Sequence, residues 1–201
     1  MEQDITWMLF DLTGVISSFS FDNPEKQTIN DKEYIEKQLE AIYLLEEYAK
    51  YAIGEMSQEE LFDAFKIVND CDLTFDEFEE VHRRSIFPIA GMEDLLKRLH
   101  DRYKLAIVSN EGSEWGRRKL TASGLGDYFN EVIISGDIGV LKPNKEFFAK
   151  SLGIVGASPS ECVFVDDTEE NVKSAEELGI TSILFSSAEE FKKALEDRRL
   201  I

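Results

Sequence analysis

The chain has 201 residues, of which 43% are hydrophobic and 11% aromatic, which is enough apolar material for a globular core. Its 41 acidic and 22 basic residues give a net charge of −19, and this excess argues against binding to nucleic acid or to anionic membranes. The start of the chain has no basic leader, and no apolar run approaches the roughly 20 residues of a membrane span, so we expect a cytoplasmic protein.

Short apolar runs, mostly rich in β-branched or aromatic residues, predict strands that are buried on both faces. They cover residues 5–10, 105–108, 132–134, 162–165 and 181–185. Helical patterns separate the later runs and close the chain, at residues 113–123, 144–152, 169–178 and 188–200. This alternation predicts an α/β fold with a doubly wound parallel sheet, in which the strands, numbered along the chain, take the order 3-2-1-4-5.

Residues 17–88 interrupt the alternation, because their patterns predict helices only. One long helix is expected over residues 31–51. Two shorter helices, over 59–68 and 76–84, are each preceded by a capping box, Ser57 with Glu60 and Thr74 with Glu77. We therefore predict two domains, an α/β core of residues 1–16 and 89–201 and a helical domain of residues 17–88, called the inserted segment below. Another helix, over 91–102, leads into the second strand.

Polar residues follow four of the five predicted strands. Ligands of open parallel sheets bind beyond the carboxyl ends of the strands, so these residues are read together. The first strand is followed by Asp11, Leu12 and Thr13, the second by Ser109 and Asn110, the third at some distance by Lys142, and the fourth by Asp166 and Asp167.

Three of these residues suit a metal ion. Adjacent acids such as Asp166 and Asp167 repel each other, and a divalent cation held between them and Asp11 relieves the repulsion. Mg²⁺ is the cation that such hard oxygen ligands favour. A carboxylate is also an accepted covalent nucleophile, so Asp11 is the candidate to attack phosphorus.

The other residues suit a phosphate group. Backbone N–H groups after the first two strands, at Leu12 and Asn110, are expected to bind phosphate oxygens together with the Ser109 hydroxyl. Lys142 supplies a positive charge for both the phosphate and Asp11. The only two histidines, His82 and His100, fall in helical stretches without a partner pattern for a triad or a zinc site, and we expect them at helix surfaces or ends.

Four motifs occur in a fixed order along the chain: FDLTGV, IVSN, GVLKP and FVDDTEEN. With them the sequence resembles the haloacid dehalogenase-like hydrolase superfamily over nearly its whole length. The stretches GEMSQEELF and SGDIGVLKP are similar to a subgroup of sugar phosphatases with a small helical cap, which corresponds to the inserted segment.

The resemblance implies a role for each matching residue. It implies Asp11 as nucleophile, Ser109 and Lys142 as ligands of the phosphate and the intermediate, and Asp166 as a metal ligand. Asp167 would hold a metal-bound water, and Thr13 would offer its backbone carbonyl to Mg²⁺.

Thr13 departs from the pattern of the superfamily. Most of its phosphatases have an aspartate two residues after the nucleophile, which protonates the leaving group and then activates water. A threonine hydroxyl does not titrate near neutral pH. The resemblance offers two precedents for another residue in this catalytic position, Thr in ion-pumping ATPases and Tyr in haloacid dehalogenases.

The expectation from the sequence is a Mg²⁺-dependent phosphatase that acts on a small phosphorylated metabolite, a sugar phosphate being one candidate, through an aspartyl-phosphate on Asp11. Two alternatives stay open. The first is a 2-haloacid dehalogenase-type hydrolase, against which the doubled acids and the absence of Tyr at position 13 argue. The second is a weakly active or inactive protein that binds a phosphorylated metabolite. The sequence predicts no oligomeric state.

Overall fold

A computed structural model of the chain describes residues 4–19, 28–29, 32–33, 41–69 and 72–201. At its centre lies a five-stranded sheet in the order β7-β6-β1-β8-β9, with every neighbouring pair parallel. The strands are β1 (Trp7–Phe10), β6 (Lys104–Ser109), β7 (Glu131–Ile134), β8 (Cys162–Asp166) and β9 (Thr181–Leu184). The predicted order of strands is thus confirmed.

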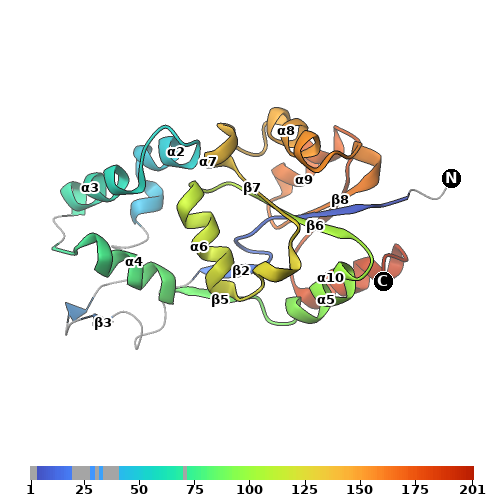
Figure 1. Cartoon of the computed structure of the whole chain (residues 1–201), viewed down its shortest axis with the longest axis horizontal. Helices are drawn as coiled ribbons and strands as arrows, with labels where there is room; N and C mark the ends of the chain where they lie inside the picture. The colour runs from blue at the N-terminus through green and yellow to red at the C-terminus, as the bar shows by residue number, and fades with distance from the viewer. Residues whose placement is uncertain (1–3, 20–27, 30–31, 34–40, 70–71) are drawn as a thin grey trace.

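Helices cover both faces of the sheet (Figure 1). The helices α5 (Met92–His100) and α10 (Ala188–Asp197) pack on one face, and α8 (Lys145–Val155) and α9 (Glu169–Glu176) pack on the other. Since both faces are covered, all four residues of β1 are buried, which explains its continuous apolar run. None of the helices in the described part of the chain is long and apolar enough to cross a membrane.

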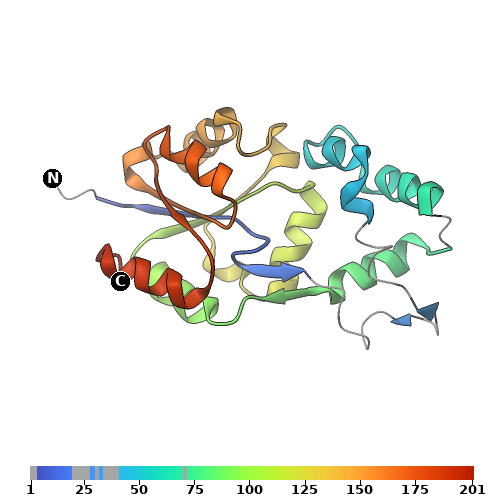
Figure 2. The same cartoon turned by 180° about the vertical axis from the view of Figure 1, so that it is seen from behind.

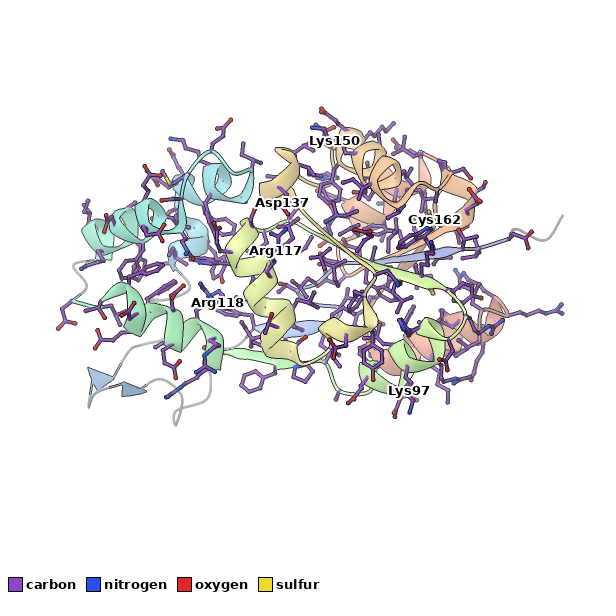
Figure 3. The ribbon with its side chains drawn as sticks, viewed as in Figure 1. Lys97, Arg117, Arg118, Asp137, Lys150 and Cys162 are labelled. Carbon is purple, nitrogen blue, oxygen red and sulfur yellow. The ribbon has the colours of Figure 1, made fainter. Side chains whose placement is uncertain are left out.

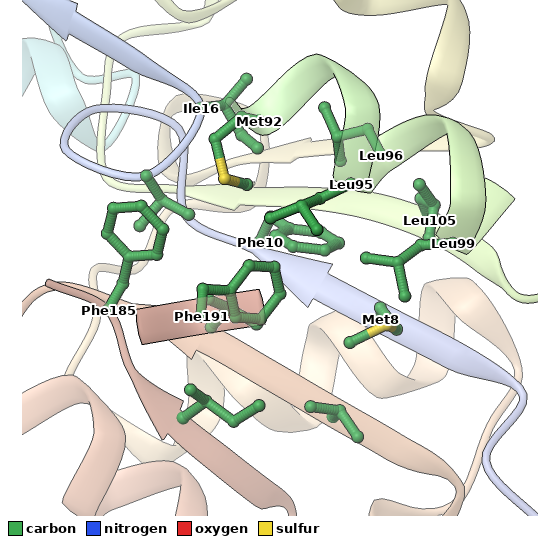
Figure 4. Packing of buried hydrophobic residues seen from close by; sticks show 14 of the residues in the cluster. Met8, Phe10, Ile16, Met92, Leu95, Leu96, Leu99, Leu105, Phe185 and Phe191 are labelled. Atoms are coloured by element: carbon green, nitrogen blue, oxygen red, sulfur yellow. The ribbon is translucent and has the colours of Figure 1, made fainter. Parts of the chain in front are cut away.

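The two faces of the sheet have separate hydrophobic cores. Leu9 and Phe164 face the core under α8 and α9. Cys162 of β8 lies in the same core (Figure 3). It is a free thiol, and burial raises its pKa to about 11. Met8 and Phe10 face the core under α5 and α10, where the rings of Phe10 and Phe191 meet edge to face (Figure 4). Alternate residues of β1 therefore fix the strand from both sides.

The inserted segment lies beyond the carboxyl ends of the central strands (Figure 2). Its described elements are β2 (Ser17–Phe19), β3 (Thr28–Ile29), β4 (Lys32–Glu33), the 3-10 helix η2 (Ala41–Leu44), α2 (Glu46–Ala52), α3 (Gln58–Asn69), α4 (Phe75–Arg84) and β5 (Ile86–Pro88). Both predicted capping boxes are confirmed. In one, Ser57 and Glu60 exchange hydrogen bonds of 2.9 and 3.2 Å, and in the other Thr74 and Glu77 do the same at 2.9 and 3.3 Å.

Two predictions for this segment were wrong. One continuous helix over 31–51 does not form, because residues 32–33 are strand β4 and Leu45 is extended. Among the described residues of this range, α2 and the 3-10 helix η2 are helical, and residues 34–40 lie outside the described residues. The segment also contains strands, since β2 pairs antiparallel with β5 where the chain leaves the core and returns to it. A strand of three residues whose partner is about 70 residues away has no periodicity to read.

The remaining elements connect the core. They are α6 (Ser113–Ser123), η3 (Gly126–Tyr128), α7 (Ser135–Ile138) and η4 (Pro159–Glu161). The loop between β6 and α6 packs tightly on the inserted segment, since a Cβ at Gly112 would meet the ring of Tyr51 at 2.0 Å. The Tyr51 hydroxyl also accepts a hydrogen bond from the backbone N–H of Trp115 at 3.3 Å. Contacts of this kind hold the inserted segment over the carboxyl edge of the sheet.

Candidate active site at the carboxyl edge of the sheet

The parallel register brings the predicted nucleophile next to the predicted metal ligand. Phe10 of β1 is aligned with Ile107 of β6 and with Val165 of β8. The next residue, Asp11, donates its backbone N–H to Val165 at 2.8 Å, and Asp166 is the last residue of β8. Three neighbouring strands therefore end together, with Asp11 in the centre and Asp166 and Ser109 at its two sides.

Lys142 joins two of these carboxylates. Its ammonium Nζ lies 2.8 Å from Asp11 Oδ1 and 2.7 Å from Asp166 Oδ2, and all three side chains are buried or nearly so. Burial by itself lowers the pKa of Lys142, but the two carboxylates outweigh burial and raise it. Burial raises the pKa of Asp11 to about 6, against the opposing effect of Lys142 and with a further contribution from the charge of Asp166. At neutral pH this leaves Asp11 mostly ionised.

Asn110 holds the backbone from which Lys142 extends. Its side-chain amide donates to the carbonyl of Lys142 at 2.8 Å and accepts from the backbone N–H of Lys142 at 2.7 Å. The Asn110 side chain therefore positions Lys142. That the backbone N–H of Asn110 binds a phosphate oxygen stays a prediction. The same applies to the backbone of Leu12 and to the hydroxyl of Ser109, which the structure places at the same edge.

Three carboxylates converge on a site that suits a metal ion. Asp11, Asp166 and Asp167 each offer an oxygen, and these oxygens lie within 4.8 Å of one another. Burial and the neighbouring charge of Asp166 raise the pKa of Asp167, which is the repulsion that a cation relieves. Hard oxygen ligands without histidine or cysteine match Mg²⁺, so the residues present fit that ion.

The loop residues around the acids hold them in place. The side-chain amide of Asn171 donates to both oxygens of Asp166 at 3.1 Å, and the backbone N–H of Thr168 donates to its Oδ1 at 2.8 Å. Gly14 has a φ of +94°, and a Cβ there would meet Asp167 Oδ2 at 2.1 Å. Only glycine fits this position, because any side chain would displace Asp167.

A cavity of about 370 Å³ opens beside Thr13. Its lining comes from the core (Thr13, Asn110, Glu111, Lys119) and from the inserted segment (Phe19, Tyr43, Tyr48). Thr13 follows the predicted nucleophile Asp11 by two residues, although Asp11 itself is not among the residues that line the cavity.

Two charged residues of this cavity were not predicted as site residues. Glu111 and Lys119 form an ion pair, with 1% and 3% of their surfaces exposed. The ammonium Nζ of Lys119 lies 3.4 Å from Thr13 Oγ1, and the Tyr48 hydroxyl donates to Glu111 Oε1 at 2.5 Å. One signal was present in the sequence, since Lys119 stands four residues after Trp115 on the buried stripe of α6.

His82 corrects another expectation. It was expected at a helix surface or end, and it does lie in the last turn of α4. It is nevertheless completely buried in the inserted segment, where its Nε2 lies 2.9 Å from the Tyr43 hydroxyl. Burial, assisted by the positive charges of Lys119 and Arg118, holds the pKa of His82 well below its ordinary value of 6.5. The folded protein therefore keeps this imidazole neutral.

This burial predicts a loss of stability in mild acid. As the pH falls below 6.5, His82 takes up a proton in the unfolded chain but not in the folded one, so the free energy of unfolding decreases. Relative to a His82→Phe variant, the wild type should lose about 1.4 kcal/mol per pH unit below that value. Urea unfolding between pH 7.5 and 5.5 measures the difference. His100→Gln, a change of the exposed histidine, is the control and should keep the wild-type pH dependence; equal slopes for wild type and His82→Phe would contradict the assignment.

Comparison with known proteins agrees with this geometry. A sequence model of the family described as haloacid dehalogenase-like hydrolase matches residues 8–185. The chain is 28% identical over 155 residues to flavin mononucleotide hydrolase 1 of Arabidopsis thaliana, covering 75% of this chain and 61% of that protein. It is 32% identical over 108 residues to the phosphoserine phosphatase of Thermus thermophilus, covering 53% and 43%. The chain thus spans less than two thirds of the length of these relatives.

Solved structures share the fold. A HAD family enzyme of Bacteroides thetaiotaomicron, crystallised as a magnesium complex, superposes with a TM-score of 0.75 at 22% identity, covering 96% of this chain and 98% of that one. L-2-haloacid dehalogenase of Xanthobacter autotrophicus superposes with a TM-score of 0.65 at 21% identity, covering 89% and 76%. At these identities the similarity shows the fold alone.

Proposed function

The chain belongs to the haloacid dehalogenase-like hydrolase family, and from this premise we propose that it is a Mg²⁺-dependent phosphatase that hydrolyses a small phosphorylated metabolite. The observation that carries the proposal is the meeting of a buried lysine with three carboxylates: Lys142 bridges Asp11 and Asp166, and Asp167 stands beside them. This arrangement supplies a nucleophile, a cation for the phosphoryl group and a donor set for a metal ion.

In the proposed reaction, a carboxylate oxygen of Asp11 attacks phosphorus while the bond from phosphorus to the leaving oxygen breaks. The product of this step is an aspartyl-phosphate. Water then attacks its phosphorus, which releases inorganic phosphate and restores the carboxylate. Lys142 keeps the Asp11 side chain oriented throughout, because it is itself anchored between Asp166 and Asn110.

Phosphate oxygens are proposed to bind the Ser109 hydroxyl, the Lys142 ammonium and the backbone N–H groups of Leu12 and Asn110. Asp11, Asp166, Asp167 and the carbonyl of Thr13 would hold Mg²⁺. When bound there, the ion neutralises charge on the phosphate and on the carboxylates. Without it, the acids and the net charge of −19 would repel an anionic substrate.

The cavity beside Thr13 favours a small leaving group. At about 370 Å³ it has room for a sugar or a similar compact metabolite. Among the relatives, the phosphoserine phosphatase is named for a substrate of this size, whereas flavin mononucleotide is larger, and a sugar phosphate is our candidate. We further propose that the inserted segment, residues 17–88, is a cap domain on an α/β core of residues 1–16 and 89–201, that the protein is cytoplasmic, and that it binds neither nucleic acid nor membranes.

The test is a panel of phosphorylated metabolites and 2-haloacids, assayed for phosphate and halide release with Mg²⁺ and with a chelator. We expect phosphate release from at least one small phosphate ester, and only with Mg²⁺. Halide release without the metal would instead support a dehalogenase. Tight binding of a phosphorylated metabolite without turnover would support a binding protein.

A further inference from the structure

Lys119 is a buried cation placed beside the residue that departs from the family pattern. Its ammonium lies 3.4 Å from the hydroxyl of Thr13, and Lys119 lines the cavity that opens beside Thr13. Thr13 belongs to the same short loop as Asp11 and borders this cavity, so a leaving group that occupies the cavity during attack by Asp11 would lie beside Thr13 and Lys119. Lys119 therefore brings a positive charge to the position where a leaving oxygen would become negative.

The surroundings fix this charge in place. Glu111 pairs with Lys119, and the hydroxyl of Tyr48 in turn donates to Glu111. The ammonium also lies 5.4 Å from the ring centre of Phe19 and 5.3 Å from that of Tyr43, within the range of cation–π attraction. A donor held in this way needs little reorganisation during the reaction, which is the condition for strong electrostatic stabilisation.

We propose that Lys119 is a catalytic residue that stabilises the negative charge developing on the leaving-group oxygen, with Glu111 as its positioning residue. The inference rests on the proposed phosphatase function. As the bond from phosphorus to the leaving oxygen breaks, its electron pair stays on that oxygen, and the new bond forms between phosphorus and Asp11. The Lys119 ammonium donates a hydrogen bond to the departing oxygen, which takes its proton from water after the bond has broken.

This role explains why a threonine at position 13 is compatible with turnover. A threonine supplies no acid, but the neighbouring ammonium supplies charge to the same oxygen. If the ion pair and its contacts with the rings of the inserted segment served only to hold α6 in place, its loss would reduce kcat/KM for all substrates alike. If Lys119 acts on the leaving oxygen, removing it must reduce kcat/KM most for the substrates with the poorest leaving groups.

The experiment compares Glu111→Gln with the double variant Glu111→Gln/Lys119→Met. The double variant removes the ammonium without leaving an unpaired buried carboxylate, and the amide oxygen introduced by Glu111→Gln remains an acceptor for Tyr48. For each variant, kcat/KM is measured with Mg²⁺ on a series of phosphate esters whose leaving groups have graded pKa values. This parameter reports the steps up to the breaking of the ester bond, so hydrolysis of the aspartyl-phosphate does not obscure it. Arg117→Met is the control, because Arg117 lies on the same helix but pairs with Asp137 at the surface (Figure 3).

Relative to Glu111→Gln, we expect kcat/KM of the double variant to fall about 10²–10³-fold on alkyl phosphates, which is the range for a lost oxyanion donor. On 4-nitrophenyl phosphate the fall in kcat/KM should be much smaller. Its kcat/KM should therefore depend more steeply on the leaving-group pKa than that of Glu111→Gln, while Arg117→Met keeps the wild-type dependence. An equal loss on all esters, or an unchanged dependence, would overturn the role of Lys119 and leave the phosphatase proposal standing. A wild type without activity on any ester would overturn both.

Discussion

Asp11→Asn is expected to abolish phosphate release, with a loss beyond the ~10²–10⁴-fold that removal of a general acid or base typically causes. The substitution removes the attacking oxygen itself, so the covalent route is closed rather than slowed. The structure gives no reason for unfolding, because the amide oxygen of Asn can still accept the hydrogen bond that Lys142 donates to Asp11 Oδ1. Steady-state turnover of an activated aryl phosphate with Mg²⁺ measures the loss.

A second measurement identifies the intermediate. Protein quenched in acid during turnover of a phosphate-labelled substrate should carry label in the wild type and none in Asp11→Asn. Asp137→Asn is the matched control, because the same change is made at a partly exposed carboxylate that pairs with Arg117 and belongs neither to the acidic cluster nor to the cavity lining. Wild-type turnover in Asp11→Asn would show that another group, or water, attacks phosphorus.

The sheet could be predicted because each of its strands can be recognised from a short stretch of sequence. Every core strand is a short apolar run, since helices cover both faces, and each polar residue that follows a run is delivered to the same edge by parallel pairing. Asp11, Lys142 and Asp166 could therefore be predicted to converge from far apart in the chain. The order of the strands was predicted from the alternation of strands and helices and from the connection rules of parallel sheets.

The inserted segment was less predictable because its structure depends on distant partners. The apolar spacing that predicted a helix over 31–51 continues through Leu45, yet this residue is extended and its neighbours pack on Trp115 of the core. Similarly, Lys119 looks like an ordinary solvated lysine on a helix until Glu111 and the rings of the inserted segment enclose it. Contacts between the core and the inserted segment join residues that are far apart in the chain, so a single sequence gives little indication of them.

Lys142 is the residue whose loss should affect stability and activity together. In Lys142→Met the buried carboxylates of Asp11 and Asp166 lose their only cationic partner among the described residues, and breaking a buried pair in this way typically costs about 3–5 kcal/mol. Because Lys142 lowers the pKa of Asp11, its removal raises that pKa above about 6. Less of Asp11 is then ionised at neutral pH in the metal-free protein. Turnover should fall as well, because the nucleophile and the phosphoryl group lose the ammonium that orients and stabilises them.

The same shift determines how the variant responds to pH. The folded-state pKa of Asp11 lies above its ordinary value of 3.8, so the folded chain holds a proton that the unfolded chain has already released. Stability therefore falls as the pH rises from about 4 through the folded-state pKa, and the fall should be larger and extend further in Lys142→Met than in the wild type. Urea unfolding at pH 5 and pH 8 in a chelator measures this fall in stability, with Lys142→Arg as the control that keeps the charge.

Added Mg²⁺ should recover more stability in Lys142→Met than in the wild type, because the cation replaces the missing charge among three carboxylates. A stability difference between Lys142→Met and the wild type that is the same at pH 5 and pH 8, together with an equal response of both proteins to Mg²⁺, would show that the lysine does not control the ionisation of these acids.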